Sequence, residues 1–204
     1  IYYSIKVALD SNEISRVIVS TDDTEIATIA CRYGAEIPFM RPEELARDES
    51  VDYEVFRHAL TTLKETENYI PDAVVLLRPT CPLRNVKVVN RAVRIFKTSS
   101  TADSLRSVSI ATETPYKMWR INENGLMNPM LAIEGNPEPF NTPRQKLPLV
   151  YWQNGYIDVT KYSTVIEKHS ITGTKILPFV IEEEIVDIDD AEALIRAEQI
   201  ISGA

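Results

Sequence analysis

The sequence has few of the residues on which thiol, disulfide and histidine chemistry depend. Among its 204 residues there are two cysteines, Cys31 and Cys81, and two histidines, His58 and His169. The cysteines form neither a disulfide framework nor a CxxC pair, so reduced thiols in a cytoplasmic protein are the simplest interpretation. Two isolated histidines give little support to a zinc site or a Ser-His-Asp triad.

Long apolar runs and excess positive charge are also absent from the sequence. The longest clear apolar run, residues 73–77 (AVVLL), is far shorter than the roughly 20 residues that a membrane-spanning helix needs, so no membrane partner is predicted. The formal net charge of −8 at pH 7 argues against a nucleic acid as the main partner. It does not argue against one small anion held by a few arginines and a metal ion.

Apolar residues alternate between strand-like and helix-like spacing through the first half of the chain. Short β-branched segments typical of buried strands occupy residues 16–20, 36–40, 73–77 and 105–110. Helical periodicity occurs in Tyr2–Leu9 and around residues 24–33, 55–63 and 86–96. This alternation predicts an α/β fold with right-handed crossovers, a mostly parallel sheet and helices on both faces.

The pattern changes at Glu113. Residues 117–121 followed by Glu123-Asn124-Gly125 predict a hairpin, and residues 129–148 are rich in proline. We interpret residues 113–148 as an excursion from the sheet, used as a lid or as a dimerisation arm. Strands are expected again at 150–159 and 175–180, and a helix at 190–202, so residues 1–204 are interpreted as a single domain.

Polar segments follow several of the expected strands. They are residues 20–23 (STDD), 41–42 (RP), 78–80 (RPT) and 186–189 (VDID). Ligands of open parallel sheets bind beyond the carboxyl ends of the strands. Arginine forks hold phosphate oxygens and carboxylates hold Mg²⁺, so these segments suit a phosphorylated substrate bound with a divalent metal.

The aspartates in these segments also have a structural interpretation. Asp22 and Asp23 are more typical of helix caps than of ligands. Asp187 and Asp189 are two residues apart, so in an extended segment their side chains would point the same way and hold one metal ion. Asp189 or Asp190 could instead cap the last helix, and the residues alone leave both interpretations open.

The other candidates are equally open at this level. Arg41 and Arg78 could be solvated surface residues, and Asn154-Gly155 is a common turn dipeptide. Cys81 has no evident neighbouring base that would make it a nucleophile.

Six segments taken in order resemble the acylneuraminate cytidylyltransferase (CMP-sialic acid synthetase) family. They are VIVSTDDTEIA (17–27), RPEELARDES (41–50), LLRPTCPLR (76–84), PRQKLP (143–148), NGYIDV (154–159) and VDIDDAEAL (186–194). The resemblance covers nearly all of the chain. It implies a Rossmann-like nucleotidyltransferase fold of three layers, a homodimer formed through the excursion, and transfer of CMP from CTP to an acidic nine-carbon sugar with release of pyrophosphate.

The resemblance also assigns roles to matching residues. Arg41, Ser50 and Asp52 would bind the nucleotide. Asp187 and Asp189 would be catalytic and hold Mg²⁺, which would bridge phosphate oxygens during in-line attack by the anomeric hydroxyl.

The remaining matches concern the acid sugar and the phosphates. Arg78 and Thr80, in the loop that continues to Arg84, would lie near the sugar and the ribose. Substrate would also contact four residues further along the chain, with Arg144 counted among the catalytic residues: Lys117, Arg144, Gln145 and Asn154. No general base can be named.

The sequence departs from the family pattern at several positions. Many sialic acid enzymes carry Gln in place of Arg78 and Arg in place of Trp152, and several carry Tyr in place of Asp158. We therefore expect a different nonulosonic acid, such as a legionaminic- or pseudaminic-type sugar, because an arginine favours an additional anionic or acceptor group on the ligand.

The resemblance further implies a first strand and a Gly/Ser-rich phosphate loop ahead of the first helix. The printed sequence begins at Ile1, within that helix, and its six glycines include no phosphate-loop cluster. As printed, the chain is expected to lack a central strand, to bind CTP poorly and to turn over slowly or not at all. A glycosyltransferase using a nucleotide sugar, the related cytidylyltransferase for the acid Kdo and a catalytically inactive nucleotide-binding homologue are the alternatives.

Overall fold

The computed structural model describes residues 1–183 and 185–203, and a four-stranded sheet organises most of them. The strand order is β1-β5-β2-β6. These strands are β1 (Ala73–Leu76), β5 (Tyr151–Lys161), β2 (Ser104–Ile110) and β6 (Ile176–Val180), and a separate hairpin contains β3 (Trp119–Ile121) and β4 (Met127–Pro129). The expected hairpin around Gly125 is thereby confirmed.

The sheet is mixed rather than mostly parallel. β5 runs antiparallel to both β1 and β2, whereas β2 and β6 are parallel. β1, β2 and β6 therefore share one direction and β5 alone is reversed. The α/β class is confirmed, but the parallel arrangement is confirmed only in part. The reason is that β5 returns directly from the excursion and pairs beside β2, as the second strand of a hairpin does.

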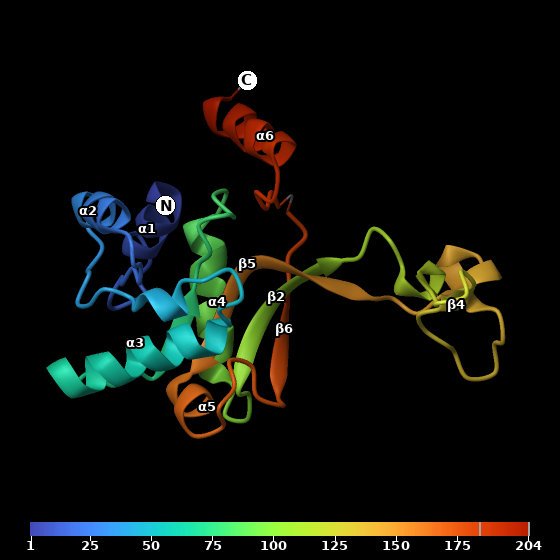
Figure 1. Ribbon diagram of the computed structural model, residues 1–204, viewed down its shortest axis with the longest axis horizontal. Helices are drawn as coiled ribbons and strands as arrows, with labels where there is room; N and C mark the ends of the chain where they lie inside the picture. The colour runs from blue at the N-terminus through green and yellow to red at the C-terminus, as the bar shows by residue number, and fades with distance from the viewer. Residues whose placement is uncertain (184, 204) are drawn as a thin grey trace.

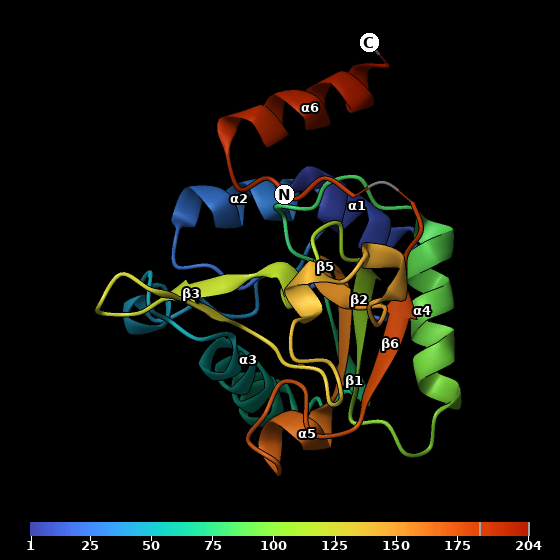
Figure 2. The same ribbon diagram turned by 90° about the vertical axis from the view of Figure 1, so that its right-hand side faces the viewer.

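The described part of the chain contains six α-helices, and the last of them stands apart from the sheet (Figure 1). They are α1 (Tyr2–Leu9), α2 (Thr24–Arg32), α3 (Asp52–Glu67), α4 (Val86–Thr98), α5 (Tyr162–Ile166) and α6 (Ala191–Ser202). Figure 2 shows the sheet between α4 on one side and α3 on the other. Within residues 1–183 and 185–203, no helix is long and apolar enough to cross a membrane.

Side-chain caps fix the starts of three helices. Asp23 accepts hydrogen bonds from the backbone N–H groups of Glu25 and Ile26 at the start of α2. Asn85 caps α4 through the N–H of Lys87, and the Oδ1 of Asp190 caps α6. These bonds satisfy N–H groups that a helix start leaves without partners. The capping interpretation is therefore confirmed for Asp23, and the last helix is capped by Asp190 rather than by Asp189.

The apolar core is divided into two clusters of unequal size. The large cluster joins α4 to β2, β5 and β6 and includes Val89, Leu105 and Ile157, all fully buried. The small cluster centres on Ile5 and Ala30 near the N-terminus, with partly buried apolar residues against it. Most of the burial that stabilises the fold therefore lies in the C-terminal two thirds.

The strands expected at residues 16–20 and 36–40 are not formed as regular strands. Among the described residues, their strand pairing consists of one parallel bridge between Ile18 and Glu36. Residues 17–19 bond to the segment at Glu36 on one edge, and their other edge faces a cavity of about 710 Å³. β1 lies across this cavity and pairs, within the described chain, with β5 alone. The expectation of strands was wrong here because a strand in a sheet interior needs a neighbour on each edge.

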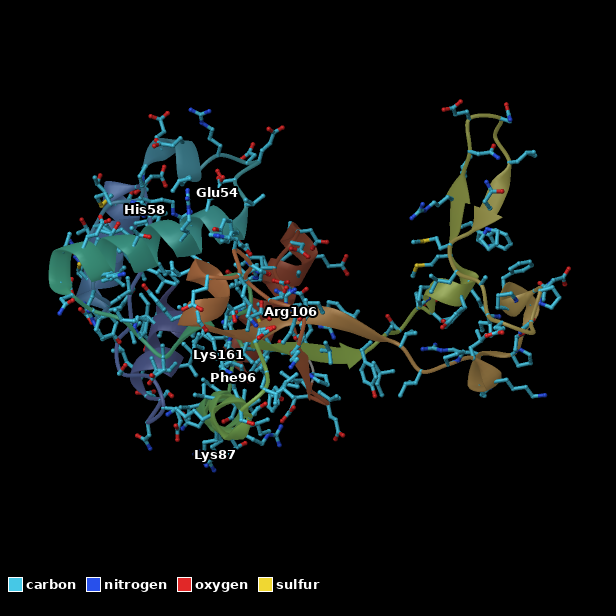
Figure 3. All side chains as sticks on the ribbon, turned by 90° about the horizontal axis from the view of Figure 1, so that it is seen from below. Glu54, His58, Lys87, Phe96, Arg106 and Lys161 are labelled. Atoms are coloured by element: carbon cyan, nitrogen blue, oxygen red, sulfur yellow. The ribbon has the colours of Figure 1, made fainter. Side chains whose placement is uncertain are left out.

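Residues 113–148 form the expected excursion, which we call the arm. Figure 1 and Figure 3 show the arm projecting away from the sheet, joined to it through the ends of β2 and β5. Trp119 packs on Phe140 with ring centroids 4.5 Å apart, which gives the arm a small core of its own.

Candidate functional site

The loop after β1 is held in place by Arg84. Its guanidinium donates hydrogen bonds to the backbone oxygens of Cys81, Tyr156 and Gly155 and to the hydroxyl of Ser4. Burial lowers the pKa of Arg84, and this network compensates the desolvated cation. The loop from Arg78 to Arg84 is thus tied to β5 and to α1. Arg84 is a structural anchor that the sequence did not identify.

Arg78 is the basic residue at the centre of the candidate site. Its Nη2 atom donates to Asp52 Oδ2 at 2.8 Å and lies 3.9 Å from Asp158 Oδ2. Burial alone would lower the pKa of Arg78, but the hydrogen bond to Asp52 and the carboxylates of Asp158 and Asp187 outweigh it, so the pKa is raised. The guanidinium therefore stays charged among three carboxylates.

Asp187 belongs to the C-terminal part of the chain and lies near Arg78. The N–H of Ile188 donates to the carbonyl of Thr80 at 2.8 Å, which ties this segment to the loop after β1. A Cβ atom added to Gly155 would lie 3.3 Å from Asp187 Oδ2 and 4.0 Å from Arg78 Cδ. The structure therefore brings Arg78, Gly155 and Asp187 together, and the positions of the Arg78 and Asp187 segments after expected strands agree with this arrangement.

One oxygen of Asp187 fits a metal ion. Its Oδ1 atom is buried and has no hydrogen-bond partner among the described residues. An unpartnered buried carboxylate oxygen is costly unless a cation or a ligand donor completes it. Nowhere in residues 1–183 and 185–203 do three or more His, Cys, Asp or Glu side chains gather as a metal cage. This donor set suits Mg²⁺, which commonly takes one or two carboxylates and completes its shell with water and substrate phosphates.

Asp189 lies differently from Asp187. Its side chain is exposed, and its N–H donates to the carbonyl of Asp187 at 3.2 Å, which closes a tight turn. The sequence argument assumed an extended segment, and that assumption was wrong. A shared metal ion held by both carboxylates remains a prediction.

The residues predicted to bind the nucleotide lie around the same end of the molecule. Arg41 Nε donates to Ser20 Oγ at 3.1 Å, and Arg41 is one of the residues lining the cavity. Ser50 Oγ accepts from the N–H of Arg47 and donates to the carbonyl of Glu44, so its hydroxyl shapes the loop before α3. Asp52, the first residue of α3, joins this region to Arg78.

The arm carries three predicted substrate residues away from this cluster. Lys117 ends the short 3₁₀ helix η2 (Pro115–Lys117), and Arg144 and Gln145 lie in η4 (Arg144–Lys146). All three are exposed, and Arg144 Nη2 donates to the carbonyl of Ala111 at 2.9 Å. Within one chain the structure does not bring them to Arg78 and Asp187 (Figure 1).

Asn154 is fully buried in β5, where its side-chain amide supports the strand. Its Nδ2 donates to Ser109 Oγ at 2.9 Å, and its Oδ1 accepts from the N–H of Tyr156. Gly155 follows with a φ of +67°, opposite a register shift between Arg106 and Val108. The Asn-Gly pair thus forms an irregularity within β5 rather than a turn between elements.

Two further residues belong to the cluster: Asp158, which the resemblance marked as a departure from the family pattern without giving it a role, and Arg106, which was missed. Asp158 is 7% exposed in β5, and its Oδ1 accepts from Arg106 Nε at 3.2 Å. Burial raises the pKa of Asp158, with Arg106 and Arg78 acting in the opposite direction. Charged residues in two otherwise buried strands were the signal that could have identified them. Cys81 is buried as well, and burial raises the pKa of its thiol, which disfavours a nucleophilic role.

Comparison with known proteins places this chain in a family. The family model described as cytidylyltransferase matches residues 1–125. The CMP-N,N'-diacetyllegionaminic acid synthase of Legionella pneumophila is 31% identical over 93% of this chain, which spans 79% of that protein. The N-acylneuraminate cytidylyltransferase of Escherichia coli is 27% identical over 92% of this chain, which spans 42% of that protein.

A solved structure supports the fold. The CMP:2-keto-3-deoxy-manno-octonic acid synthetase complexed with CTP has a TM-score of 0.67 at 12% identity, covering 98% of this chain and 86% of that one. At this identity the similarity establishes the architecture alone. The family model spans more than half of the chain and the Legionella protein is related over nearly all of it, so this chain belongs to the cytidylyltransferase family of nucleotidyltransferase enzymes.

Proposed function

We propose that the protein transfers CMP from CTP to the anomeric hydroxyl of a nonulosonic acid and releases pyrophosphate. The observation that carries the proposal is the buried Oδ1 of Asp187, which has no hydrogen-bond partner among the described residues and lies near Arg78. A carboxylate oxygen that is open to a metal ion, near a charged guanidinium, suits a metal-bound phosphate and an anionic co-substrate. The names of the related proteins from Legionella and Escherichia support this substrate class.

Different residues would bind the nucleotide and the sugar. Arg41, Ser50 and Asp52 would bind the nucleotide at the start of α3. Asp187 and Asp189 would hold Mg²⁺, which neutralises phosphate charge and lowers the pKa of the attacking hydroxyl when bound. Most of the rate would then come from positioning the hydroxyl in line with the bond to the leaving pyrophosphate.

The acid sugar would bind beside Arg78 and Thr80. Arg78 would contact an anionic or acceptor group, because a guanidinium offers several donors in a fixed geometry. Asn154 would act through its place in β5, since its amide groups are already bonded within the sheet. We propose a legionaminic- or pseudaminic-type acid over a sialic acid, because Arg78 and Asp158 together replace an uncharged pair.

We also propose that the protein is a homodimer whose arm completes the site of the partner. Lys117, Arg144 and Gln145 lie on the arm, remote from the cluster of their own chain. The arm exposes many apolar side chains, including Ile121 at 75% and Leu126 at 64%, and exposed apolar surface of this kind favours association.

Pyrophosphate release by the full-length gene product tests the function directly. The assay offers CTP or another nucleoside triphosphate, with Mg²⁺, against a panel of legionaminic, pseudaminic and sialic acids and Kdo. Release with CTP and one nonulosonic acid supports the proposal and identifies the substrate. Release with Kdo alone contradicts the substrate class. No release across the panel, together with binding of a nucleotide sugar, would favour a glycosyltransferase, and the absence of any metal-dependent nucleotide binding would favour an inactive homologue.

A further inference from the structure

Four charged side chains of alternating sign form a row across the sheet. Arg106 Nε donates to Asp158 Oδ1 at 3.2 Å, Asp158 Oδ2 lies 3.9 Å from Arg78 Nη2, and the same Nη2 donates to Asp52 Oδ2 at 2.8 Å. We call these four residues the charged row. No two neighbours in it carry the same sign, so each member is held electrostatically on at least one side.

The row runs from two paired strands to the loop after β1 and ends on a helix. Arg106 lies in β2 and directly opposite Asp158 in β5, while Leu76, two residues before Arg78, is opposite Asp158 on the other side. Asp52 begins α3. Figure 3 shows Arg106 in the body of the molecule rather than on the arm. The positions of Arg106 and Asp158 are thus set by strand register, which is more rigid than a surface loop.

Burial separates Asp158 from the other members of the row. Its side chain is 8% exposed, against 22% for Arg106, 31% for Arg78 and 43% for Asp52. A buried ion pair of this kind contributes little net stability compared with apolar residues of the same size. Stability alone therefore does not explain the Asp158 carboxylate. Its position next to Arg78 suits a role in orienting the Arg78 guanidinium.

Arg106 holds Asp158 from the side away from the reaction site. Its Nη1 also donates to Gln153 Oε1 at 2.9 Å, so the guanidinium is fixed at two points. The fixed Asp158 carboxylate can therefore hold the guanidinium of Arg78 in place. Arg78 lies next to Gly155, which also lies next to Asp187. Without Asp158, Arg78 would retain its hydrogen bond to Asp52, on an exposed helix start, and the more distant charge of Asp187.

We propose that Asp158 is a positioning residue that fixes the guanidinium of Arg78 for binding of the acid sugar. The inference rests on the proposed function, since it assumes that Arg78 contacts that substrate. We therefore expect Asp158 to affect binding of the acid sugar strongly and binding of CTP weakly.

A double-mutant cycle on the full-length protein tests the inference. We expect Asp158→Asn to raise the KM of the acid sugar about tenfold, with the KM of CTP changed less than about threefold, because coupled neighbours interact by this much. In an Arg78→Gln background the same substitution should change the sugar KM less than about twofold. Equal effects of Asp158→Asn in both backgrounds would overturn the inference, because Asp158 would then act independently of Arg78.

Asp103→Asn is a matched control for general damage. Asp103 is also a buried carboxylate, held by Lys168 at 2.6 Å at the start of β2. Its substitution should lower the Tm and leave the ratio of the two KM values unchanged. If Asp158→Asn does not fold, Arg106→Gln is the second variant, and it should raise the sugar KM in the same selective way. An unchanged KM for the sugar in Arg106→Gln would contradict the inference that the charged row positions Arg78.

A spectroscopic measurement separates failure of the inference from failure of the proposed function. NMR of arginine side chains reports hindered rotation of a guanidinium, and the signal of Arg78 is assigned by its loss in Arg78→Gln. We expect the guanidinium to rotate faster in Asp158→Asn than in the wild type, although the hydrogen bond to Asp52 remains in both. If no substrate pair releases pyrophosphate, the proposed function fails while this comparison still decides the role of Asp158. A rotation rate that is unchanged in Asp158→Asn overturns the inference.

Discussion

At the scale of single residues, the site depends on atoms placed close together with little spare room. Gly155 lies beside both Asp187 and Arg78, and its φ of +67° is unfavourable for any residue with a side chain. Asp187 offers an oxygen without a partner among the described residues. Small substitutions at these positions should therefore separate effects on stability from effects on activity.

Substitution of Gly155 should impair the site beyond its cost in strain. Gly155→Ala should destabilise the fold by about 1 kcal/mol or more, because of its positive φ, and should weaken Mg²⁺-dependent nucleotide binding by displacing the Asp187 carboxylate. Calorimetric titration and urea unfolding measure the two effects. Gly125→Ala is the matched control, since Gly125 has a φ of +75° and nothing within 4 Å of an added Cβ. Equal loss of binding in both variants would contradict the role of the contact.

Removal of the Asp187 charge should reduce activity without reducing stability. Asp187→Asn should lower the rate of pyrophosphate release by about 100-fold or more, since a metal ligand contributes several kcal/mol to the transition state. The Tm measured without metal should not fall, because Oδ1 makes no hydrogen bond within the described chain. Asp190→Asn should retain activity, because asparagine also caps a helix. A normal rate for Asp187→Asn would exclude Asp187 from the reaction.

At the scale of elements, the sequence predicted helices well and edges of the sheet poorly. Apolar periodicity and caps located α1, α2, α4 and α6 because these signals are local. The segment at residues 16–20 reads as a strand, yet it forms a single bridge among the described residues, because strand formation depends on neighbours far away in sequence. The reversal of β5 was missed for the same reason.

The candidate site shows the same division between local and distant information. The aspartate and arginine segments at strand ends were identified from position, and the structure brings Arg78 and Asp187 together. The pairing of Asp158 with Arg106 depends on the register of β2 against β5, which single-residue patterns do not specify. Arg84 was missed because most of its hydrogen-bond acceptors are backbone oxygens. Every residue type carries a backbone oxygen, so the identities of the partner residues do not indicate this network.

The contact between Asp103, at the start of β2, and the segment between α5 and β6 should be sensitive to acid. Lys168 and the backbone N–H groups of Thr174 and Lys175 lower the pKa of Asp103 to about 2. A lowered folded-state pKa contributes stability above the unfolded value of about 4, and that contribution is lost as the pH falls from about 4 to about 2. Urea unfolding should therefore show a difference between wild type and Asp103→Asn at pH 5 that shrinks at pH 3. A constant difference would show that the carboxylate charge is not responsible.

At the scale of the whole molecule, the arm is the element that projects furthest with its apolar side chains exposed (Figure 1). The body buries its main apolar core against α4 and also exposes residues such as Val51 and Ile195, whereas one hairpin of the arm exposes Ile121, Leu126 and Met127 together. Apolar surface exposed on a projecting element is typical of an interface between protein chains.

A charged residue on the arm should prevent assembly. Ile121→Asp should convert the proposed dimer to a monomer without lowering the stability of the body, because Ile121 is 75% exposed. Light scattering after size-exclusion chromatography measures the mass, and Glu123→Gln at the tip of the hairpin is the control. A wild-type protein of monomer mass at micromolar concentration would contradict the dimer.

The divided core has a consequence for the order in which the molecule opens. The N-terminal region holds the small cluster around Ile5 and Ala30, and the cavity separates residues 17–19 from β1. Regions with few buried contacts exchange their amide hydrogens through openings that require less free energy than global unfolding. In the printed chain, the amides of α1 and α2 should exchange first, while those of β2 and α4 should persist until the whole chain unfolds. The folded population would then include a minor form in which the sheet and α4 remain intact while α1 and α2 are open.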